Sequence, residues 1–165
     1  MFTIRKATTA DCALIQKLAQ QIFPVTYKDI LTPEQTDYMM EWMYAPDHIY
    51  KQMQEQGHLY FIAYNSGIPC GYGSIVQEEE SIFHLQKLYV LPSFQGMNCG
   101  SFLFKEIIRY IKDLHPGHCR LRLNVNRYNK AIKFYERMGM KKIAEGDFPI
   151  GNGYYMNDYI MELEI

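Results

Sequence analysis

A polar loop that runs into a strongly amphipathic helix is the segment of this sequence best suited to chemistry. The loop spans Leu91 to Gly100, and the helix follows directly. The first N–H groups of a helix lack intrahelical acceptors and lie at the positive end of the helix dipole, so such a junction binds phosphate. Many loops enter a helix through a glycine and bind nothing, so the junction alone leaves both interpretations open. No Gly-Lys-Ser/Thr and no Gly-x-Gly-x-x-Gly is present, which excludes a P-loop and a dinucleotide fingerprint.

Hydrophobic periodicity predicts the elements that position this loop. Residues 82–90 form a strand directly before it, and 101–114 an amphipathic helix directly after it. Further strands are expected over 2–7, 59–64, 68–77, 120–125, 141–146 and 155–165. Further helices are expected over 14–22, 33–44, 47–56 and 129–138. This order predicts one mixed α/β domain over 1–165, with a mostly antiparallel central sheet flanked by helices.

Composition narrows the class of protein. The chain has 17 Lys and Arg against 18 Asp and Glu, a formal net charge of −1, so a nucleic-acid partner is not expected. No apolar stretch approaches the roughly 20 residues that span a bilayer, and charges occupy the N-terminal segment, so we expect a cytoplasmic protein without a membrane partner. The cysteines form no metal-binding pair and are expected to be reduced and buried. They are Cys12, Cys70, Cys99 and Cys119. We expect no metal site.

Two segments together resemble a known family. The segment Leu88–Gly100 resembles the acyl-CoA signature of the GNAT superfamily of N-acetyltransferases, a strand followed by Arg/Gln-x-x-Gly-x-Gly/Ala and a helix. The segment Asn129–Met140 resembles the second motif, Asn-x-x-Ala-x-x-Phe-Tyr-x-x-x-Gly-Phe. Each motif is weak alone, but both occur in the family's order and separation. Asn98 stands where the family has its first loop glycine; asparagine tolerates left-handed backbone, so we expect altered cofactor contact and not its loss.

The resemblance implies a GNAT-like acyl-CoA N-acyltransferase fold and acetyl-CoA as co-substrate. The backbone of Leu88, Tyr89 and Val90 would pair with the pantetheine, and an N–H group near Leu88 or Val90 would polarise the thioester carbonyl. The loop would bind the pyrophosphate through Gln95, Gly96, Met97, Asn98, Cys99, Gly100 and Ser101. Asn129 would reach the pantetheine or the opposite side of the cleft.

The resemblance also implies a general acid and leaves the base open. Tyr135 stands at the family's general-acid tyrosine, which protonates the departing thiolate; a core tyrosine beside Phe134 is the alternative. On the strand 82–90, His84 titrates in the range of a base acting through water, and Gln86 could orient that water. A structural histidine at position 84 is equally consistent with the sequence. The other histidines are expected at the surface: His48, His58, His115 and His118.

The acceptor walls implied by the resemblance look most like those of bacterial polyamine (spermidine/spermine) N-acetyltransferases. Aromatic faces and carboxylates would bind a cationic amine, and Tyr27, Tyr38 and Glu41 could supply them; the alternative is a solvated helix face. The sequence thus predicts acetyl transfer from acetyl-CoA to a primary amine by direct attack in a ternary complex. A protein N-terminus, an amino acid or an aminoglycoside are alternative acceptors, and a non-catalytic acyl-CoA-binding module is a further alternative. A homodimer could form through the strand 155–165.

Overall fold

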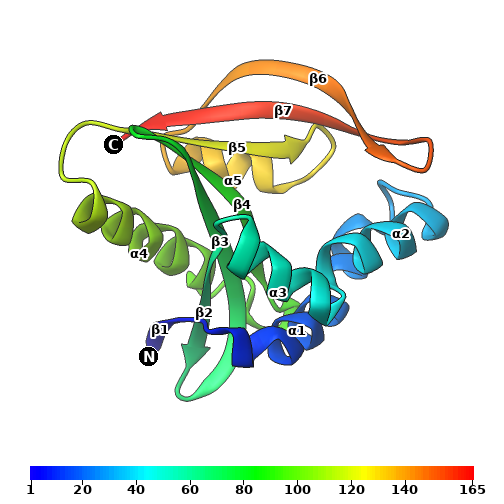
Figure 1. The fold of residues 1–165 in the computed structure, drawn as a ribbon, viewed down its shortest axis with the longest axis horizontal. Helices are drawn as coiled ribbons and strands as arrows, with labels where there is room; N and C mark the ends of the chain where they lie inside the picture. Colours follow the sequence, from blue (N-terminus) through cyan, green and yellow to red (C-terminus); the bar gives the residue numbers. More distant parts are fainter.

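The computed structural model describes all residues from 1 to 165 and contains one seven-stranded sheet with helices on both faces (Figure 1). The strand order is β1-β2-β3-β4-β5-β7-β6, and only β4 and β5 run parallel. The strands are β1 Phe2–Lys6, β2 Leu59–Asn65, β3 Ile68–Glu79, β4 Ile82–Val90, β5 Arg120–Asn126, β6 Lys141–Gly151 and β7 Tyr154–Glu164. The α-helices are α1 Cys12–Tyr27, α2 Pro33–Tyr44, α3 Pro46–Glu55, α4 Cys99–Leu114 and α5 Ala131–Arg137. The predicted mixed, mostly antiparallel sheet flanked by helices is confirmed.

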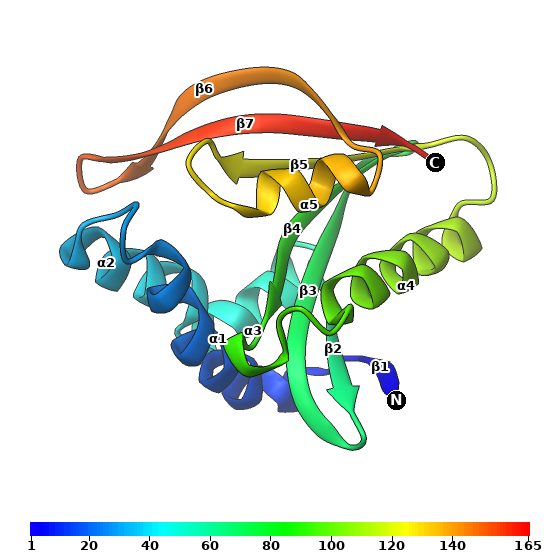
Figure 2. The ribbon, with the colours of Figure 1, turned by 180° about the vertical axis from the view of Figure 1, so that it is seen from behind.

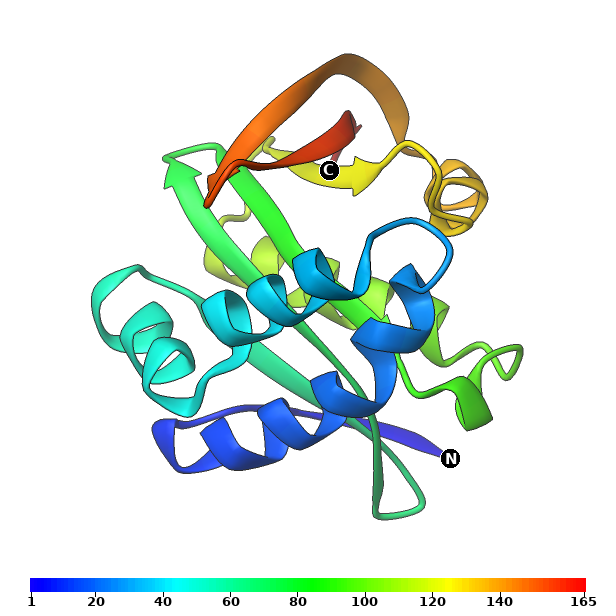
Figure 3. The same ribbon diagram turned by 90° about the vertical axis from the view of Figure 1, so that its right-hand side faces the viewer.

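The helices divide between the two faces of the sheet, and each face has its own hydrophobic core. Helices α4 and α5 cover the face seen in Figure 2, where Leu103 and Ile107 of α4 pack against Phe83 of β4. Helices α1, α2 and α3 cover the other face, where Ile15 and Phe23 belong to a second core (Figure 3). Apolar residues at helical spacing on α1 and α4 fill these cores, which fixes both helices against the sheet.

Strand β4 pairs along its length with β3 but only briefly with β5. The parallel ladder joins Ile82 to Arg120, Phe83 to Leu121 and His84 to Arg122, and ends there. Beyond His84 the two strands separate, and β5 continues beside β7 (Figure 2). We call this place the β4–β5 fork. The side of β4 that would face β5 is therefore unpaired from residue 85 to residue 90.

The tip of the β6–β7 hairpin docks on α2 (Figure 1). The Tyr38 hydroxyl donates to the Ile150 carbonyl at 2.8 Å, and the Gln35 side chain donates to the Tyr155 carbonyl at 2.9 Å. Gly151 has φ +94, and a Cβ there would lie 2.5 Å from the Tyr38 hydroxyl. The turn therefore requires glycine both for its left-handed backbone and for its close approach to α2.

Three elements differ from the sequence predictions. Helix α1 continues through Pro24 to Tyr27, because Pro24 lies on the exposed side of a helix whose other face is buried. Strand β6 runs to Gly151, well beyond the predicted end at residue 146. The strand predicted at 155–165 lies between β5 and β6, so both of its edges are occupied and the predicted pairing across a dimer is wrong.

The predicted burial of the cysteines is confirmed, whereas the predicted exposure of His58 is wrong. All four cysteines are free and buried, as predicted. His58 is not a surface residue: it is half-buried, its Nδ1 is buried without a partner, and burial together with the charges of Lys87 and His84 lowers its pKa to about 4. No helix of the chain combines the length and the apolar character that crossing a bilayer needs.

Candidate active site

The free side of β4 presents the backbone groups of Leu88 and Val90. The Tyr89 carbonyl points toward β3, since a Cβ added at Gly71 would lie 2.7 Å from it. Because successive residues of a strand direct their N–H and C=O groups to opposite sides, Leu88 and Val90 direct theirs into the fork. The side-chain amide of Gln95 donates to the Val90 carbonyl at 3.2 Å. The Leu88 N–H and C=O and the Val90 N–H therefore remain for an extended ligand.

The loop after β4 delivers the N-terminus of α4 to the same place. Asn98 has φ 66 and ψ 15, which confirms the left-handed backbone expected for this position. The first hydrogen bond of the helix runs from the Phe102 N–H to the Asn98 carbonyl, so the N–H groups of residues 99–101 have no intrahelical acceptor. The Asn98 side chain is exposed and makes no capping bond. The junction thus offers three backbone donors and one free amide to an anion.

Helix α1 and the end of β5 close the fork from the other side. The hydroxyls of Tyr27 and Tyr89 lie 3.0 Å apart, within hydrogen-bond distance. The Asn129 side chain donates to the Tyr27 hydroxyl at 3.5 Å and accepts from the Ala131 N–H at 2.8 Å, at the start of α5. Tyr27, Tyr89 and Asn129 therefore meet across three elements that are far apart in the sequence.

Tyr135 of α5 lies against this group. It is 7% exposed, and its ring centroid lies 5.3 Å from that of Phe134 and 6.3 Å from that of Phe104. Burial raises the pKa of its hydroxyl, and the neighbouring Tyr27 acts in the same direction. The ring packs in the core, as the structural alternative for Tyr135 expects, and the raised pKa keeps its hydroxyl protonated.

Comparison with known proteins assigns the fold and the class of this site. A model of the acetyltransferase (GNAT) domain matches residues 27–163. The chain belongs to the GNAT acetyltransferase family. An uncharacterised N-acetyltransferase of Mycobacterium tuberculosis is 24% identical over 156 residues, which cover 94% of this chain and 98% of the relative. The predicted enzyme class, a GNAT N-acetyltransferase, is confirmed.

Solved structures of this family superpose on nearly the whole chain. The PaiA N-acetyltransferase of Thermoplasma acidophilum, solved in complex with coenzyme A, has a TM-score of 0.81 at 20% identity and covers 100% of this chain and 99% of its own. The ribosomal-protein-S18-alanine N-acetyltransferase of Escherichia coli has a TM-score of 0.73 at 20% identity, over 100% and 94%. The spermidine/spermine N-acetyltransferase SpeG of Vibrio cholerae has a TM-score of 0.70 at 17% identity, over 99% and 93%. At these identities the likeness establishes the GNAT fold.

Of the two predicted base candidates, His84 lies in the part of β4 that pairs with β5, and Gln86 lies in the unpaired part. His84 belongs to the closed ladder, with its Nδ1 3.3 Å from a carboxylate oxygen of Glu78. Burial lowers the pKa of His84, Glu78 opposes that shift, and Arg122 adds to it. Four residues of strand, about 13 Å, separate His84 from Leu88. Gln86 is exposed and has no partner on β3, because the register shifts there and makes it the extra residue of a bulge.

Of the three residues predicted for the acceptor, the structure places only Tyr27 at the fork. Tyr38 lies on α2, where its hydroxyl holds the β6–β7 hairpin. Glu41 is exposed on α2, and its backbone carbonyl lies 2.8 Å from the His48 ring. Tyr38 therefore anchors the tip of the β6–β7 hairpin on α2.

Sequence reasoning missed Lys87, a buried lysine on β4. It is 6% exposed, and its ammonium donates to the Tyr60 hydroxyl at 2.7 Å and to the Gln52 side chain at 3.1 Å. Its Nζ also lies 5.3 Å and 5.1 Å from the ring centroids of Tyr44 and Tyr60. Burial lowers the pKa of Lys87 to about 7. The bulge at Gln86 places Lys87 on the face opposite to Phe83 and Leu85, so alternation along the strand does not predict its surroundings.

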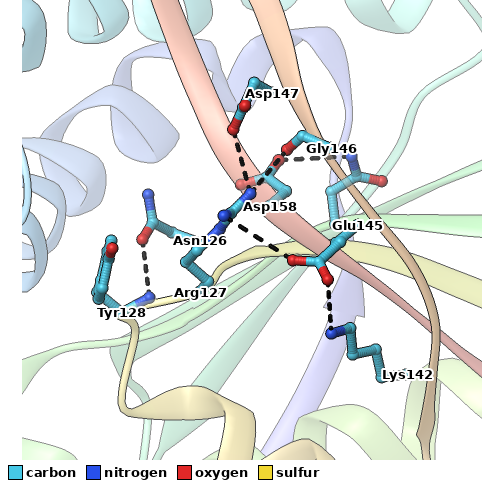
Figure 4. Close-up of polar contacts among 9 residues, drawn as sticks. Asn126, Arg127, Tyr128, Lys142, Glu145, Gly146, Asp147 and Asp158 are labelled. Carbon is cyan, nitrogen blue, oxygen red and sulfur yellow. Dashed lines mark hydrogen bonds and ion pairs between the residues drawn. The ribbon is translucent and has the colours of Figure 1, made fainter.

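Sequence reasoning also missed Asp158, a buried carboxylate on β7. It is 5% exposed and stands directly opposite Asn126 of β5 (Figure 4). Its Oδ2 accepts from the Asn124 side chain at 3.4 Å, whereas its Oδ1 is buried without a hydrogen-bond partner. Burial raises the pKa of Asp158, and Asn124 and the Arg127 charge act in the opposite direction. An acidic residue between apolar positions of a strand was the available signal.

Proposed function

We propose that this GNAT enzyme transfers the acetyl group of acetyl-CoA to a primary amine by direct attack in a ternary complex. The observation that carries the proposal is the fork, where the free backbone of Leu88 and Val90 lies beside the N-terminus of α4. A free strand edge fits an extended pantetheine arm, and the unpaired N–H groups of residues 99–101 fit a pyrophosphate. The coenzyme A complex of the Thermoplasma neighbour supports use of this cofactor.

Residues at the fork act in each step of the acetyl transfer. The N–H of Leu88 or Val90 hydrogen-bonds the thioester oxygen and stabilises the charge that develops on it. The amine nitrogen forms a bond to the carbonyl carbon, and the carbon–sulfur bond then breaks. The departing sulfur takes the proton that Tyr135 donates, and Tyr135 regains a proton from the acetylated nitrogen. Asn129 keeps the start of α5, and with it Tyr135, in place through its bond to the Ala131 N–H.

A small cationic amine, with polyamines as the leading candidates, is the acceptor that we favour. Docking of the β6–β7 hairpin on α2 through Tyr38 narrows the acceptor side, whereas a protein N-terminus needs an open groove. Three exposed acidic residues on α2 favour a polycation: Glu34, Asp37 and Glu41. The fold of the spermidine/spermine enzyme of Vibrio cholerae is similar over nearly the whole chain, which adds weak support.

The test is release of the coenzyme A thiol from acetyl-CoA with a panel of amines. The panel contains spermidine, a peptide with a free N-terminal alanine, a free amino acid and an aminoglycoside. We expect the highest kcat/KM with spermidine. Release with another amine only would retain the acetyltransferase and reject the polyamine acceptor. Acetyl-CoA that binds but is not turned over with any amine would contradict the proposed reaction.

Replacement of Tyr135 by phenylalanine tests the acid. The hydroxyl is lost while the ring packing against Phe104 and Phe134 is retained. We expect kcat to fall on the order of 10²–10⁴-fold, the usual contribution of a general acid, with the Kd of acetyl-CoA unchanged. Tyr50→Phe, at an exposed tyrosine of α3, is the matched control. An unchanged kcat in Tyr135→Phe would show that the acid is another group.

A further inference from the structure

Asp158 lies on the face of β5 and β7 that turns away from the α4–α5 core. Side chains alternate along a strand, and Leu121, Leu123 and Met161 occupy the core face. Asp158 and its cross-strand partner Asn126 occupy the opposite face. That is the side from which α1 approaches the fork with Tyr27.

A short path of contacts joins Asp158 to the fork. The Asn129 N–H donates to the carbonyl of Asn126 at 2.9 Å, and the Asn129 side chain donates to the Tyr27 hydroxyl. The charge of Asp158 contributes, after burial, to the raised pKa of Tyr27, so the carboxylate and this hydroxyl interact through space. The hydroxyl of Tyr27 also contacts that of Tyr89 on β4. Asp158 is therefore the buried carboxylate on the acceptor side of the fork.

The fold leaves one oxygen of this carboxylate without a donor. Arg127 is the cation near Asp158. Its Nη groups contact the Asp147 carboxylate at 3.1 Å, the Gly146 carbonyl at 3.4 Å and the Glu145 carboxylate at 3.8 Å, whereas its Nε is buried and, like the Asp158 Oδ1, has no hydrogen-bond partner (Figure 4). Leaving a buried acceptor unsatisfied costs about 1–3 kcal/mol, and more when it is charged. Such groups are rare in folded proteins and call for a specific explanation. A donor brought by a ligand supplies that explanation for Oδ1.

We propose that Asp158 binds the ammonium group of the acceptor through its Oδ1 and takes the proton that the amine must lose before it attacks. This inference deepens the proposed function and rests on it. One ammonium proton passes to Asp158 and from there to solvent, which leaves a neutral amine with a free electron pair. After attack a second proton leaves the nitrogen, and the sulfur receives its proton through Tyr135. The products are the acetylated amine, the coenzyme A thiol and one released proton.

Geometry favours Asp158 over His84 for this role. The Nδ1 of His84 lies 3.3 Å from a carboxylate oxygen of Glu78. His84 belongs to the part of β4 that pairs with β5, about 13 Å along the strand from Leu88. The carboxylate of Asp158 is also the natural counter-charge for an ammonium group, whereas a protonated histidine would repel it. The same site therefore recognises a cation and deprotonates it.

The pH dependence follows from the charged groups around Asp158. They are Tyr27 from α1, Arg127 after β5, and Glu145 and Asp147 from β6, which pair with Arg127. Burial raises the pKa of Asp158 above that of an ordinary aspartate, and the base must be ionised to act. We expect kcat/KM to fall on the acid side of its profile as the pH drops through this raised pKa.

The experiment compares Asp158→Asn with the wild type. Asparagine keeps the shape of the side chain but removes its charge and its basicity. With each amine that the wild type acetylates, kcat/KM is measured against pH, and the Kd of acetyl-CoA is measured by titration. We expect kcat/KM to fall on the order of 10²–10⁴-fold and the acid limb to disappear, with the Kd of acetyl-CoA unchanged. Glu162→Gln, on the same face of β7 but ion-paired with Arg122 at 2.7 Å, is the matched control and should stay near wild-type kcat/KM.

Further outcomes distinguish a failure of the inference on Asp158 from a failure of the proposed function. Wild-type kcat/KM with an unchanged acid limb in Asp158→Asn overturns the inference, even though the proposed function then stands. If the wild type acetylates no amine, the proposed function fails, and binding of spermidine to the protein saturated with coenzyme A becomes the test. Binding that is lost in Asp158→Asn supports the ammonium site, and spermidine bound equally by both proteins, or by neither, overturns it. Partial recovery of binding in Asp158→Glu would show that the charge matters and not the fold of the variant.

Discussion

Lys87 and Asp158 are both buried ionisable residues, yet the protein surrounds them in opposite ways. The ammonium of Lys87 donates to a hydroxyl and an amide within 3.1 Å and lies over two tyrosine rings. The carboxylate of Asp158 accepts one long hydrogen bond, and its other oxygen has no partner. A buried charge that the fold itself satisfies belongs to the packing of the protein. A buried carboxylate with one oxygen left unpaired beside the fork is suited to a ligand that brings a donor.

The two halves of the sheet account for this difference. Lys87 directly follows the bulge at Gln86 in the strand pair β3–β4, and its polar and aromatic neighbours come from β2, α2 and α3. Asp158 lies beyond the fork, in the half that only three residue pairs join to β4. Several elements thus surround Lys87 with polar and aromatic partners, whereas Asp158 receives its single hydrogen bond from Asn124 of β5.

The pH dependence of the free energy of unfolding should reveal the buried ammonium group of Lys87. Its pKa falls from 10.5 to about 7 in the folded protein, so between these values the unfolded chain binds one more proton than the folded chain. The free energy of unfolding of the wild type should therefore rise with pH relative to that of Lys87→Met, by up to about 1.4 kcal/mol per pH unit.

Chemical denaturation at pH 7, 8 and 9 measures this difference, and the range avoids the titration of His58 near pH 4. The acetyltransferase kcat/KM of Lys87→Met should stay within about twofold of the wild type, because Lys87 contacts only the fold. If the free energies of unfolding of the two proteins change equally between pH 7 and pH 9, the lysine is charged in the folded state at pH 9. A large loss of kcat/KM would place Lys87 with Asp158 among the functional charges.

Tyr60→Phe should change the free energy of unfolding by less than the pH-dependent difference between the wild type and Lys87→Met. The change should still be measurable. The Tyr60 hydroxyl accepts from Lys87 and donates to Gln52, so its removal leaves the ammonium with one protein acceptor. We expect the free energy of unfolding to fall by about 1–3 kcal/mol at pH 7, with kcat unchanged. Tyr50→Phe, at an exposed hydroxyl, should change it by less than about 0.5 kcal/mol. Equal effects of the two substitutions would mean that Lys87 does not need its buried partners.

The sequence predicts the local features of this molecule well. The strand 82–90 and the helix 33–44 have their predicted limits, because turn residues and proline mark both ends. Asn98 takes the predicted left-handed backbone, since the loop requires it there and asparagine tolerates it. The motifs that identify the family also lie on short, continuous segments.

Features that depend on pairing between distant segments could not be predicted in the same way. The bulge at Gln86 arises from the register against β3, and it breaks the simple alternation of side chains along the strand 82–90. Asp158 is buried because β7 inserts between β5 and β6, an order that the sequence does not state. The helix predicted over 14–22 continues through Pro24, because packing of α1 against the sheet outweighs the one lost hydrogen bond.

The smallest effect that we expect concerns Asn124, whose side chain donates the single hydrogen bond that Asp158 receives. This bond lowers the pKa of Asp158 against the effect of burial, so Asn124→Ala should raise that pKa further. If Asp158 is the base, the acid limb of kcat/KM should move to higher pH, by less than about one pH unit because a 3.4 Å bond is weak. Asn65→Ala, on a distant turn, should leave the limb in place. An acid limb that stays in place in Asn124→Ala would mean that a group other than Asp158 titrates in this range.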